Sequence, residues 1–391
     1  MSESETNPLQ AVQADAGAEM MAWGDVPMAA TFGEYEAEYA AIHRHVAILH
    51  EPQRAVLRMT GSAADRLDFL HRMTTQDLRT VPGGTSRRAL QLSDKGRIIA
   101  DMVVRHGDID TWLELDACDA QAVRTLLEGR IFAEDIRFDD GPLPRTAIRV
   151  LGPATAALLT TLAGDAASRM MAMPGTHHVL QLTSGGPMFT ASRHDLGAIT
   201  GVQLLVPDDA AARVYRTLLD AAGFEAMEHA DADYAQRRRG SLRGRPVGWL
   251  AYNTARIEAG VPRFHVDFGP DSLPAELGEA TFAEAVHLKK GCYLGQEIVA
   301  RMHNLGHPKR VIAGVRFGDD QLPVAGAQLF DPADRATPIG AITSSAVSPL
   351  LGNVVIALAV MKWGRHTPGT AVTATADGAW VEGRVVPLPF R

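Results

Sequence analysis

The chain has 391 residues, a formal net charge of −8, 46% hydrophobic residues and 21% charged residues. This length exceeds what one hydrophobic core usually organises, and the composition is that of a folded protein rather than a disordered one. The negative charge argues against broad nonspecific binding to nucleic acid, so direct nucleic-acid binding is not expected and small molecules or proteins are the expected partners.

Neither the N-terminal residues nor any later run points to a secretory signal or a membrane span. Residues 1–5 lack the basic start and the apolar stretch of a secretory signal, and no run reaches the roughly 18 apolar residues of a membrane span. The only two cysteines, Cys118 and Cys292, are too few for a disulfide framework and are typical of a reducing compartment. We therefore expect a cytoplasmic protein.

The first part of the chain contains a predicted arm, a strand, a helix and a hairpin. Residues 1–30 are rich in Ala, Glu, Gln and Met without sustained periodicity, and we predict a flexible arm. Residues 55–60 predict a strand, and Ser62 is placed to cap the helix that follows. Two apolar segments flank residues 93–96, which predicts a β-hairpin whose second strand runs from about 97 to 104.

Asp101 lies on the second strand of this hairpin, directly after Ala100. An acid in this position can move a proton or orient a ligand. It can equally be a polar residue on the open face of a strand, and the sequence leaves both interpretations open.

The middle and the C-terminal part differ in their predicted elements. Ala/Leu-rich segments at 117–127, 154–162 and 208–222 predict helices between short strands, which indicates an α+β architecture. A strongly basic stretch from Arg237 to Arg245 is typical of an exposed loop. Beyond about residue 308, strand-like segments with frequent Gly and Pro predict a small β-barrel, with strands at 311–317, 340–345, 354–360 and 371–376.

Residues 246–260 predict a helix with Pro246 near its start and Gly260 at its end. Glu258 then lies in the last turn, where a carboxylate opposes the helix dipole at a cost of about 0.3–1 kcal/mol. Either Arg256 and Arg263 compensate for this charge, or the carboxylate accepts paired hydrogen bonds from the ring NH and amino group of a ligand.

Cys292 lies in the segment Lys289-Lys290-Gly291-Cys292-Tyr293-Leu294-Gly295-Gln296-Glu297. The glycines permit an unusual turn around the thiol, while the lysines, and the dipole of a helix opened by Gly295-Gln296, would favour the thiolate. This pattern indicates a reactive or ligating thiol. The alternative is a small buried side chain in a tight turn.

The segment from Lys290 to Glu297 resembles the signature of the folate-binding YgfZ-like branch of the glycine cleavage T-protein (aminomethyltransferase) superfamily. Ala255-Arg256-Ile257-Glu258-Ala259-Gly260 is similar to the segment from which T-protein-like aminomethyltransferases hold the folate pterin. The resemblance covers roughly residues 32–385. The arginine-rich stretch from Arg237 to Arg245 departs from it and resembles an insertion.

The resemblance implies an α+β fold, a three-lobed T-protein-like ring with a central folate channel and a C-terminal β-barrel. The implied organisation is a flexible N-terminal arm at 1–30, a T-protein-like folate-binding α+β region of two interleaved subdomains at 31–305, and the barrel domain at 306–391.

The resemblance also implies a cofactor, tetrahydrofolate or a derivative, and a set of site residues. Cys292 and Asp101 are the catalytic candidates, and Glu258, Asp101, Lys290 and Gln296 are the cofactor-binding candidates, near the Cys292 thiol. Aminomethyltransferases have paired acids where this chain has Ala100-Asp101, so the case for full transferase chemistry is weaker.

The 14 histidines form no pattern that is typical of a metal site. His43, His45 and His50 lie close in sequence, as do His303 and His307, but neither group has a Cys or acidic partner at a recognised ligand spacing. We therefore expect no metal site.

The function implied by the resemblance is support for the assembly or repair of iron–sulfur enzymes, including those that modify tRNA. The expected partners are folate and iron–sulfur client enzymes or assembly factors; one thiol alone cannot hold a cluster, which normally takes four ligands. One alternative is a tetrahydrofolate-dependent aminomethyltransferase or methyltransferase, which gives Cys292 no role. Another is a folate-binding protein without chemistry, in which Cys292 only packs. Whether the protein is an enzyme stays open.

Overall fold

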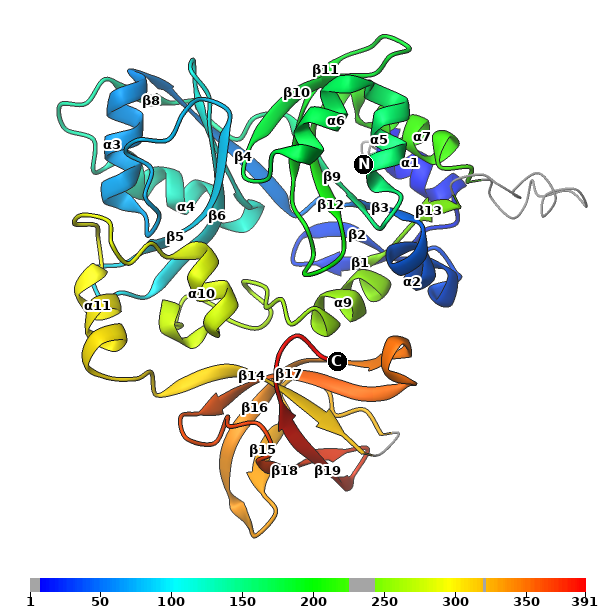
Figure 1. Ribbon diagram of the computed structural model, residues 1–391, viewed down its shortest axis with the longest axis vertical. Coiled ribbons are helices and arrows are strands. Elements are labelled where there is room, and N and C mark those ends of the chain that lie inside the picture. The colour runs from blue at the N-terminus through cyan, green and yellow to red at the C-terminus, as the bar shows by residue number, and fades with distance from the viewer. Residues whose placement is uncertain (1–7, 225–242, 319–320) are drawn as a thin grey trace, which may run out of the picture.

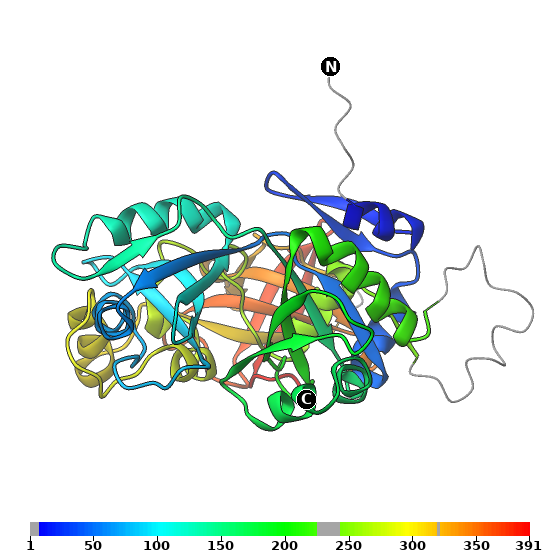
Figure 2. The same ribbon diagram turned by 90° about the horizontal axis from the view of Figure 1, so that it is seen from above.

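The computed structural model describes residues 8–224, 243–318 and 321–391. They form two α+β lobes that lie side by side and a β-barrel that lies beneath both (Figures 1 and 2). In Figure 1 the first α+β lobe is at the upper left, the second is at the upper right and the barrel is at the bottom. Within the described ranges, no helix is long and apolar enough to cross a membrane.

The first lobe is an antiparallel five-stranded sheet with two helices: β4 (Arg54–Gly61), α3 (Ala63–Met73), β5 (Thr85–Leu92), β6 (Ile98–His106), β7 (Thr111–Asp116), α4 (Ala117–Glu128) and β8 (Ile136–Phe138). The strand order is β5-β6-β7-β4-β8. The Ser62 hydroxyl accepts a hydrogen bond from the Asp65 N–H at 3.3 Å, so the predicted helix cap is confirmed. The predicted hairpin is confirmed by the pairing of β5 with β6.

The second lobe is a six-stranded sheet with helices packed on it: α2 (Tyr35–Arg44), β3 (Val46–His50), β9 (Arg145–Leu151), α5 (Thr155–Ala163), α6 (Asp165–Ala172), β10 (His177–Gln181), β11 (Met188–Arg193), β12 (Gly201–Pro207), α7 (Asp208–Ala221) and β13 (Gly244–Pro246). The strand order is β10-β11-β12-β9-β3-β13, and β13 runs parallel to β3.

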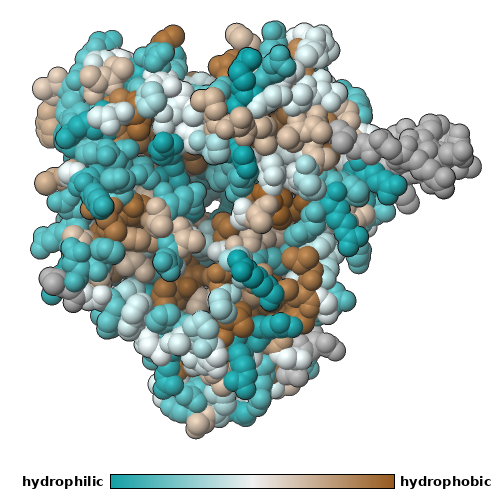
Figure 3. All heavy atoms as spheres, in the orientation of Figure 1, coloured by the Kyte–Doolittle hydropathy of each residue, from teal (hydrophilic) through white to brown (hydrophobic). Residues whose placement is uncertain are grey.

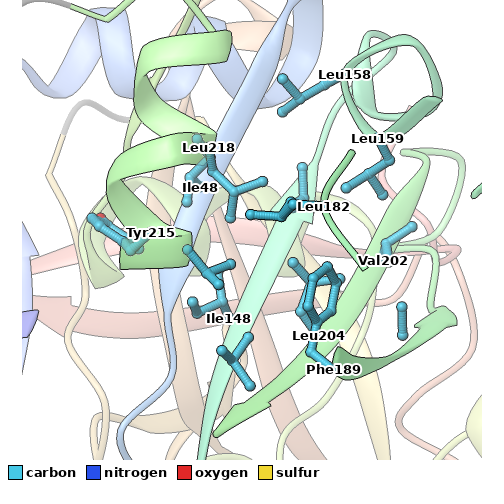
Figure 4. Packing of buried hydrophobic residues seen from close by; sticks show 14 of the residues in the cluster. Ile48, Ile148, Leu158, Leu159, Leu182, Phe189, Val202, Leu204, Tyr215 and Leu218 are labelled. Atoms are coloured by element: carbon cyan, nitrogen blue, oxygen red, sulfur yellow. The ribbon is translucent and has the colours of Figure 1, made fainter. Parts of the chain in front are cut away.

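The core of the second lobe lies between this sheet and the helices. The helix that the sequence predicts over 208–222 is α7, and its buried residues recur at the spacing of one helix face: Ala210, Ala211, Val214, Tyr215, Leu218 and Leu219. Figure 4 shows this face and α5 packing onto the sheet, with side chains that include Ile48, Ile148, Leu158, Leu159, Val202, Leu204 and Leu218.

The N-terminal segment is not a flexible arm within the described residues. It forms α1 (Pro8–Asp15) and a hairpin of β1 (Glu19–Trp23) and β2 (Val26–Thr31). Leu9 and Val12 are buried in the core of the second lobe, and α1 packs against α7. The helix is short and its apolar side chains find their partners only in the folded chain, which explains why no periodicity indicated it. Residues 1–7 lie outside the described residues.

The C-terminal lobe is a closed six-stranded barrel in the order β14-β17-β16-β15-β18-β19. Its elements are β14 (Arg310–Phe317), β15 (Gln328–Asp331), β16 (Asp334–Ser348), the 3₁₀ turn η3 (Pro349–Leu351), β17 (Val354–Lys362), β18 (Ala371–Ala376) and β19 (Ala379–Val386). All four strands that the sequence predicts are present, and the predicted barrel is confirmed.

A connecting segment runs between the α+β lobes and the barrel. It contains α9 (Trp249–Glu258), the 3₁₀ turn η2 (Pro274–Glu276), α10 (Glu279–Ala285) and α11 (Gln296–Leu305) (Figure 1). The helix predicted over residues 246–260 is α9, which begins later than expected because Pro246 pairs in β13. It ends before Gly260, whose φ is +65°.

The basic stretch lies only partly within the described residues. Residues 237–242 of this stretch, which include Arg237, lie outside the described residues. Arg245 is not in a loop: it belongs to strand β13, and its guanidinium pairs with Glu34. The tertiary pairing of β13 with β3, which the local composition cannot indicate, places this residue in the sheet.

Candidate functional site

A cavity of about 100 Å³ lies where the two α+β lobes meet the segment that follows α9. Figure 3 shows a small opening near the centre of the molecule, between the lobes. The wall combines both sheets, the connections after β3 and β11, helix α9 and the loop after it. Its residues are Glu51, Arg54, Arg88, Asp101, Met102, Val103, Asp116, Arg149, His194, Asp195, Leu196, Tyr252, Arg256, Val261, Pro262, Arg263 and Phe264.

The cavity wall is dense in charge, with five arginines and four carboxylates among its residues. Glu51 is buried, and its Oε2 accepts a hydrogen bond from Arg149 Nε at 2.9 Å. Burial opposes ionisation of Glu51, but Arg149 and Arg263 together bring its pKa below the ordinary value. Its Oε1 has no hydrogen-bond partner among the described residues. The ionised Glu51 therefore keeps a buried acceptor atom at the cavity.

The arginines of the wall are held from behind by buried carboxylates. Arg54 Nε donates to Glu114 Oε1 at 3.1 Å, and Arg54 Nη1 lies 3.3 Å from Asp116 Oδ1. Glu114 also pairs with Arg105 at 2.5 Å. Burial alone would raise the pKa of Glu114, but the charges of Arg105 and Arg54 lower it to about 2. These pairs fix the guanidinium groups before any ligand arrives, so an anion would bind to a preorganised surface.

His194 adds a neutral polar group to the same wall. Burial first, and then the positive charge of Arg149, lower its pKa well below the ordinary value. The imidazole is therefore uncharged near neutral pH and can both donate and accept a hydrogen bond. Tyr252 lies on the same wall, with its ring 5.9 Å from the Arg149 guanidinium carbon.

Asp101 is on the cavity wall, and Arg88 holds both of its carboxylate oxygens. Arg88 Nε donates to Oδ1 at 3.0 Å, and Arg88 Nη2 donates to Oδ2 at 2.7 Å. The third nitrogen of Arg88 reaches Glu284 of α10 at 2.7 Å. Ala100 is fully buried in the core of the first lobe, because successive side chains on β6 point to opposite faces. An acid at position 100 would lie in that core.

Glu258 does not line the cavity. It is buried, and the Tyr39 hydroxyl donates to its two oxygens at 2.7 and 2.8 Å. The Ser348 hydroxyl also donates to Oε1, and His43 Nε2 lies 3.2 Å from Oε2. Burial and the bond to Glu258 raise the pKa of Tyr39, so this hydroxyl keeps its proton. Glu258 thus joins α9 to α2 and to the barrel, and we call this set of contacts the Glu258 clasp.

Arg256 makes a second connection between α9 and the barrel. Arg256 Nη1 donates to Asp267 Oδ2 at 2.6 Å, and Arg256 Nη2 donates to Ser344 Oγ at 2.7 Å. Both charged side chains of the pair are almost completely buried. Arg256 therefore does not neutralise Glu258, which is one of the two interpretations that the sequence left open.

Cys292 is exposed to solvent, on the turn that precedes α11. Gly295 has a φ of +81°, and its backbone packs against the hairpin turn at Ser93, so a side chain at this position would be strained and would clash. The predicted unusual turn and the helix that begins at Gln296 are both present. The alternative of a small buried side chain is wrong, because the thiol is not packed in the interior.

Lys290 and Gln296 stabilise this turn and are not on the cavity wall. Lys290 Nζ donates to the backbone oxygens of His71, Thr74 and Gln76, with the last two at 2.6 and 2.7 Å. Burial lowers the pKa of Lys290 to about 7, but three acceptors require three N–H donors, which only the ammonium form supplies. All three donors are then occupied. Gln296 Oε1 accepts a hydrogen bond from the Tyr293 N–H at 3.1 Å.

Of the five site residues predicted from the sequence, only Asp101 lines the cavity. Glu258, Lys290, Gln296 and Cys292 lie elsewhere, so the structure does not gather them around one ligand. The wall residues that sequence reasoning missed include Glu51, Arg54, Arg149 and Arg263. They follow no motif. Arg54 and Arg149 are charged residues in largely apolar strands, which is a weak signal, whereas Glu51 and Arg263 lie outside the strands.

Comparisons with known proteins agree over nearly the whole chain. The family model described as GCVT N-terminal domain matches residues 9–290, and the one described as Glycine cleavage T-protein C-terminal barrel domain matches residues 310–391. The chain is 25% identical over 378 residues to an aminomethyltransferase of Chlorobium chlorochromatii, covering 96% of this chain and 95% of that protein. It is 26% identical over 392 residues to an aminomethyltransferase of Cutibacterium acnes, covering 98% and 97%.

A solved structure has the same fold. The crystal structure of glycine cleavage system aminomethyltransferase T from Bartonella henselae matches with a TM-score of 0.81 at 22% sequence identity, over 98% of this chain and 97% of that one. At this identity the likeness shows the fold. It confirms the predicted α+β class with its C-terminal barrel.

Proposed function

The chain belongs to the glycine cleavage T-protein family, and from this premise we propose that it is a folate-binding member that supports the assembly or repair of iron–sulfur enzymes, including those that modify tRNA. The proposal assigns two tasks to two places. The cavity between the lobes binds tetrahydrofolate or a derivative, and the exposed thiol of Cys292 acts toward the iron–sulfur enzymes or their assembly factors.

The chemistry of the cavity wall fits a folate. Tyr252 and Phe264 offer aromatic surface for a flat pterin. Glu51 Oε1 lies 3.7 Å from Arg263 Nη1 but accepts no hydrogen bond among the described residues, so this buried acceptor suits a ring NH or an amino group. Arg54 and Arg149 suit the carboxylates of a glutamyl tail. The volume of about 100 Å³ is below the roughly 300–1,000 Å³ of most ligand sites, so a whole folate requires side chains at the mouth to move.

Tetrahydrofolate, when bound, would supply a carrier for one-carbon groups. The residues of the chain would hold and orient it. Asp101 would act through its fixed pair with Arg88, whose link to Glu284 joins the cavity wall to α10. Glu258 would not contact the folate, because it lies in the Glu258 clasp, which joins α9 to α2 and to the barrel.

The observation that carries the proposed role in cluster maintenance is the presentation of Cys292. The thiol is exposed, while the turn beneath it is held by three bonds from the Lys290 ammonium and by the left-handed conformation of Gly295. Because the thiol is exposed, it does not stabilise the fold by packing. Its position on a rigid turn suits contact with a partner protein. One thiol cannot hold a cluster alone, so further ligands would come from the partner.

The test is the rescue of cluster-enzyme activity in cells that lack the gene. We expect wild-type protein and Arg301→Ala to restore the activity of an iron–sulfur enzyme that modifies tRNA, and Cys292→Ala to fail at equal protein level. Arg301 is the control because it is an exposed side chain on α11, the helix that follows Cys292. Equal rescue by Cys292→Ala would overturn the proposed role of the thiol.

A tetrahydrofolate-dependent aminomethyltransferase is the second candidate, and the activity named for both relatives favours it. Asp101 is its natural acid or base, but both of its oxygens already accept hydrogen bonds from Arg88. Proton transfer by Asp101 would require this pair to separate. Transfer of a methylene group from an amine donor to tetrahydrofolate by the purified protein, lost in Asp101→Asn, would decide for this candidate.

A further inference from the structure

Three metal-binding side chain types meet on the surface where the first lobe contacts the loop after α9. Cys118 and Asp119 lie in the first turn of α4, and His265 lies 146 residues beyond Asp119 in the chain. His265 Nε2 is 3.6 Å from Cys118 Sγ and 2.7 Å from Asp119 Oδ2. All three potential ligand atoms lie within 4.8 Å of one another.

We propose that Cys118, Asp119 and His265 bind one late first-row divalent cation such as Zn²⁺, Fe²⁺ or Co²⁺. Thiolate, imidazole and carboxylate together are the ligand set that these ions prefer, whereas Mg²⁺ and Ca²⁺ prefer oxygen ligands alone. The proposal rests on this cluster and is independent of the proposed roles of folate and of Cys292.

The distances suit tetrahedral coordination. With bonds of about 2.3 Å to sulfur and about 2.0 Å to nitrogen, a tetrahedral ion separates these two atoms by about 3.5 Å. The observed separation of Cys118 Sγ and His265 Nε2 is 3.6 Å. The separation of Asp119 Oδ2 and His265 Nε2 is 2.7 Å, shorter than the about 3.3 Å that such an ion requires. A small rotation of the Asp119 side chain supplies the difference.

The surroundings allow a cation to enter and leave one position open. Cys118 and His265 are exposed and Asp119 is half-buried, so the cluster faces solvent. Three protein ligands leave the fourth position of a tetrahedral ion for water or a group from a substrate or partner. On binding, the Cys118 thiol loses its proton to solvent and His265 binds as the neutral imidazole. The cluster adjoins the central cavity, because Asp116 and Phe264 line that cavity.

A simple ion pair explains the cluster less fully. His265 and Asp119 can pair without Cys118, and the hydrogen bond that His265 donates to Asp119 raises the pKa of His265. Cys118 Sγ lies 3.6 Å from the same ring nitrogen, His265 Nε2, which already pairs with Asp119 Oδ2 at 2.7 Å. A cation gives all three side chains a common partner.

The experiment is a titration of metal-free, full-length protein with Co²⁺, followed by optical absorption. Wild type and Cys292→Ser should bind one Co²⁺ per chain and show cobalt–thiolate charge-transfer absorption with the intense visible bands of tetrahedral Co²⁺. Cys118→Ser should lose the charge-transfer band, and His265→Asn should bind at least about tenfold more weakly. Asn suits position 265 because its φ is +65° and Asn tolerates this region.

Thermal unfolding of each variant without metal shows that it is folded, and Co²⁺ or Zn²⁺ should raise the unfolding temperature of wild type but not of Cys118→Ser. An absorption band that survives in Cys118→Ser or disappears in Cys292→Ser would overturn the proposal, since the thiol ligand would then be Cys292. The absence of any band at millimolar Co²⁺ in folded wild type would overturn it as well.

Discussion

Replacing Glu258 by Gln separates a structural role from direct contact with folate. The Glu258 carboxylate is buried and accepts hydrogen bonds from the hydroxyls of Tyr39 and Ser348. Gln keeps one acceptor oxygen, but its amide group replaces the other oxygen beside Tyr39 and His43. The change removes at least one charge-assisted hydrogen bond, so we expect the free energy of unfolding to fall by about 1.5–3 kcal/mol.

The affinity for folate should change little in the same variant, because Glu258 is not on the cavity wall. Urea unfolding followed by circular dichroism measures the stability, and a fluorescence titration with tetrahydrofolate measures the dissociation constant. Ser348→Ala is the matched control: it removes one donor to the same carboxylate and should also cost about 1.5–3 kcal/mol. An unchanged unfolding midpoint together with a dissociation constant raised tenfold would refute the clasp and make Glu258 a direct folate contact.

Three further changes test other parts of the structure. Asp267→Asn leaves the buried Arg256 without its anionic partner and should cost about 3–5 kcal/mol in urea unfolding; a loss below 1 kcal/mol would contradict this. Burial lowers the pKa of His50 to about 4, so the unfolded chain binds a proton from about pH 6.5 downward while the folded chain does not. Between pH 7 and 5 the free energy of unfolding of wild type should therefore fall by about 2 kcal/mol more than that of His50→Gln. Equal decreases in the two proteins would disprove the lowered pKa of His50. Lys290→Met should raise amide hydrogen exchange in residues 290–297 at least about tenfold, because three backbone oxygens lose their donor; unchanged exchange would show that Lys290 does not hold the turn.

The fold could be predicted where local pattern and tertiary environment agree. The apolar stripe of α7, the hairpin of β5 and β6 and the barrel strands each carry a period that matches their burial. The N-terminal helix α1 carries no such signal, since Leu9 and Val12 are buried only by contact with distant residues. Strand β13 has only three residues and pairs because β3 is already in place.

The candidate site could be predicted less well, because its partners are distant in sequence. Alternation along β6 correctly separates Asp101 from the buried Ala100. The partners of Glu258 and Lys290, by contrast, include Tyr39 and His71, each 219 residues away. No local pattern distinguishes a carboxylate that holds a ligand from one that joins two lobes.

The proposed metal site shows the same limit, because its ligands are also distant in sequence. The histidines close together in sequence did not indicate a metal site, whereas His265 meets Cys118 only through the packing of the loop after α9 on α4. Spacing rules detect metal sites formed within one segment and miss sites formed by two.

The central claim is that the cavity binds folate and that the Cys292 thiol does not take part in this binding. The most direct test is to measure the dissociation constant of tetrahydrofolate for wild type, Asp101→Asn and Cys292→Ala. Asp101 lies on the cavity wall and Cys292 does not. We expect Asp101→Asn to weaken binding about tenfold, because it loses a charge-assisted hydrogen bond with Arg88 that fixes this part of the cavity wall, and Cys292→Ala to bind as wild type does. Weaker binding by Cys292→Ala with unchanged binding by Asp101→Asn would contradict this division and place the folate beside the thiol.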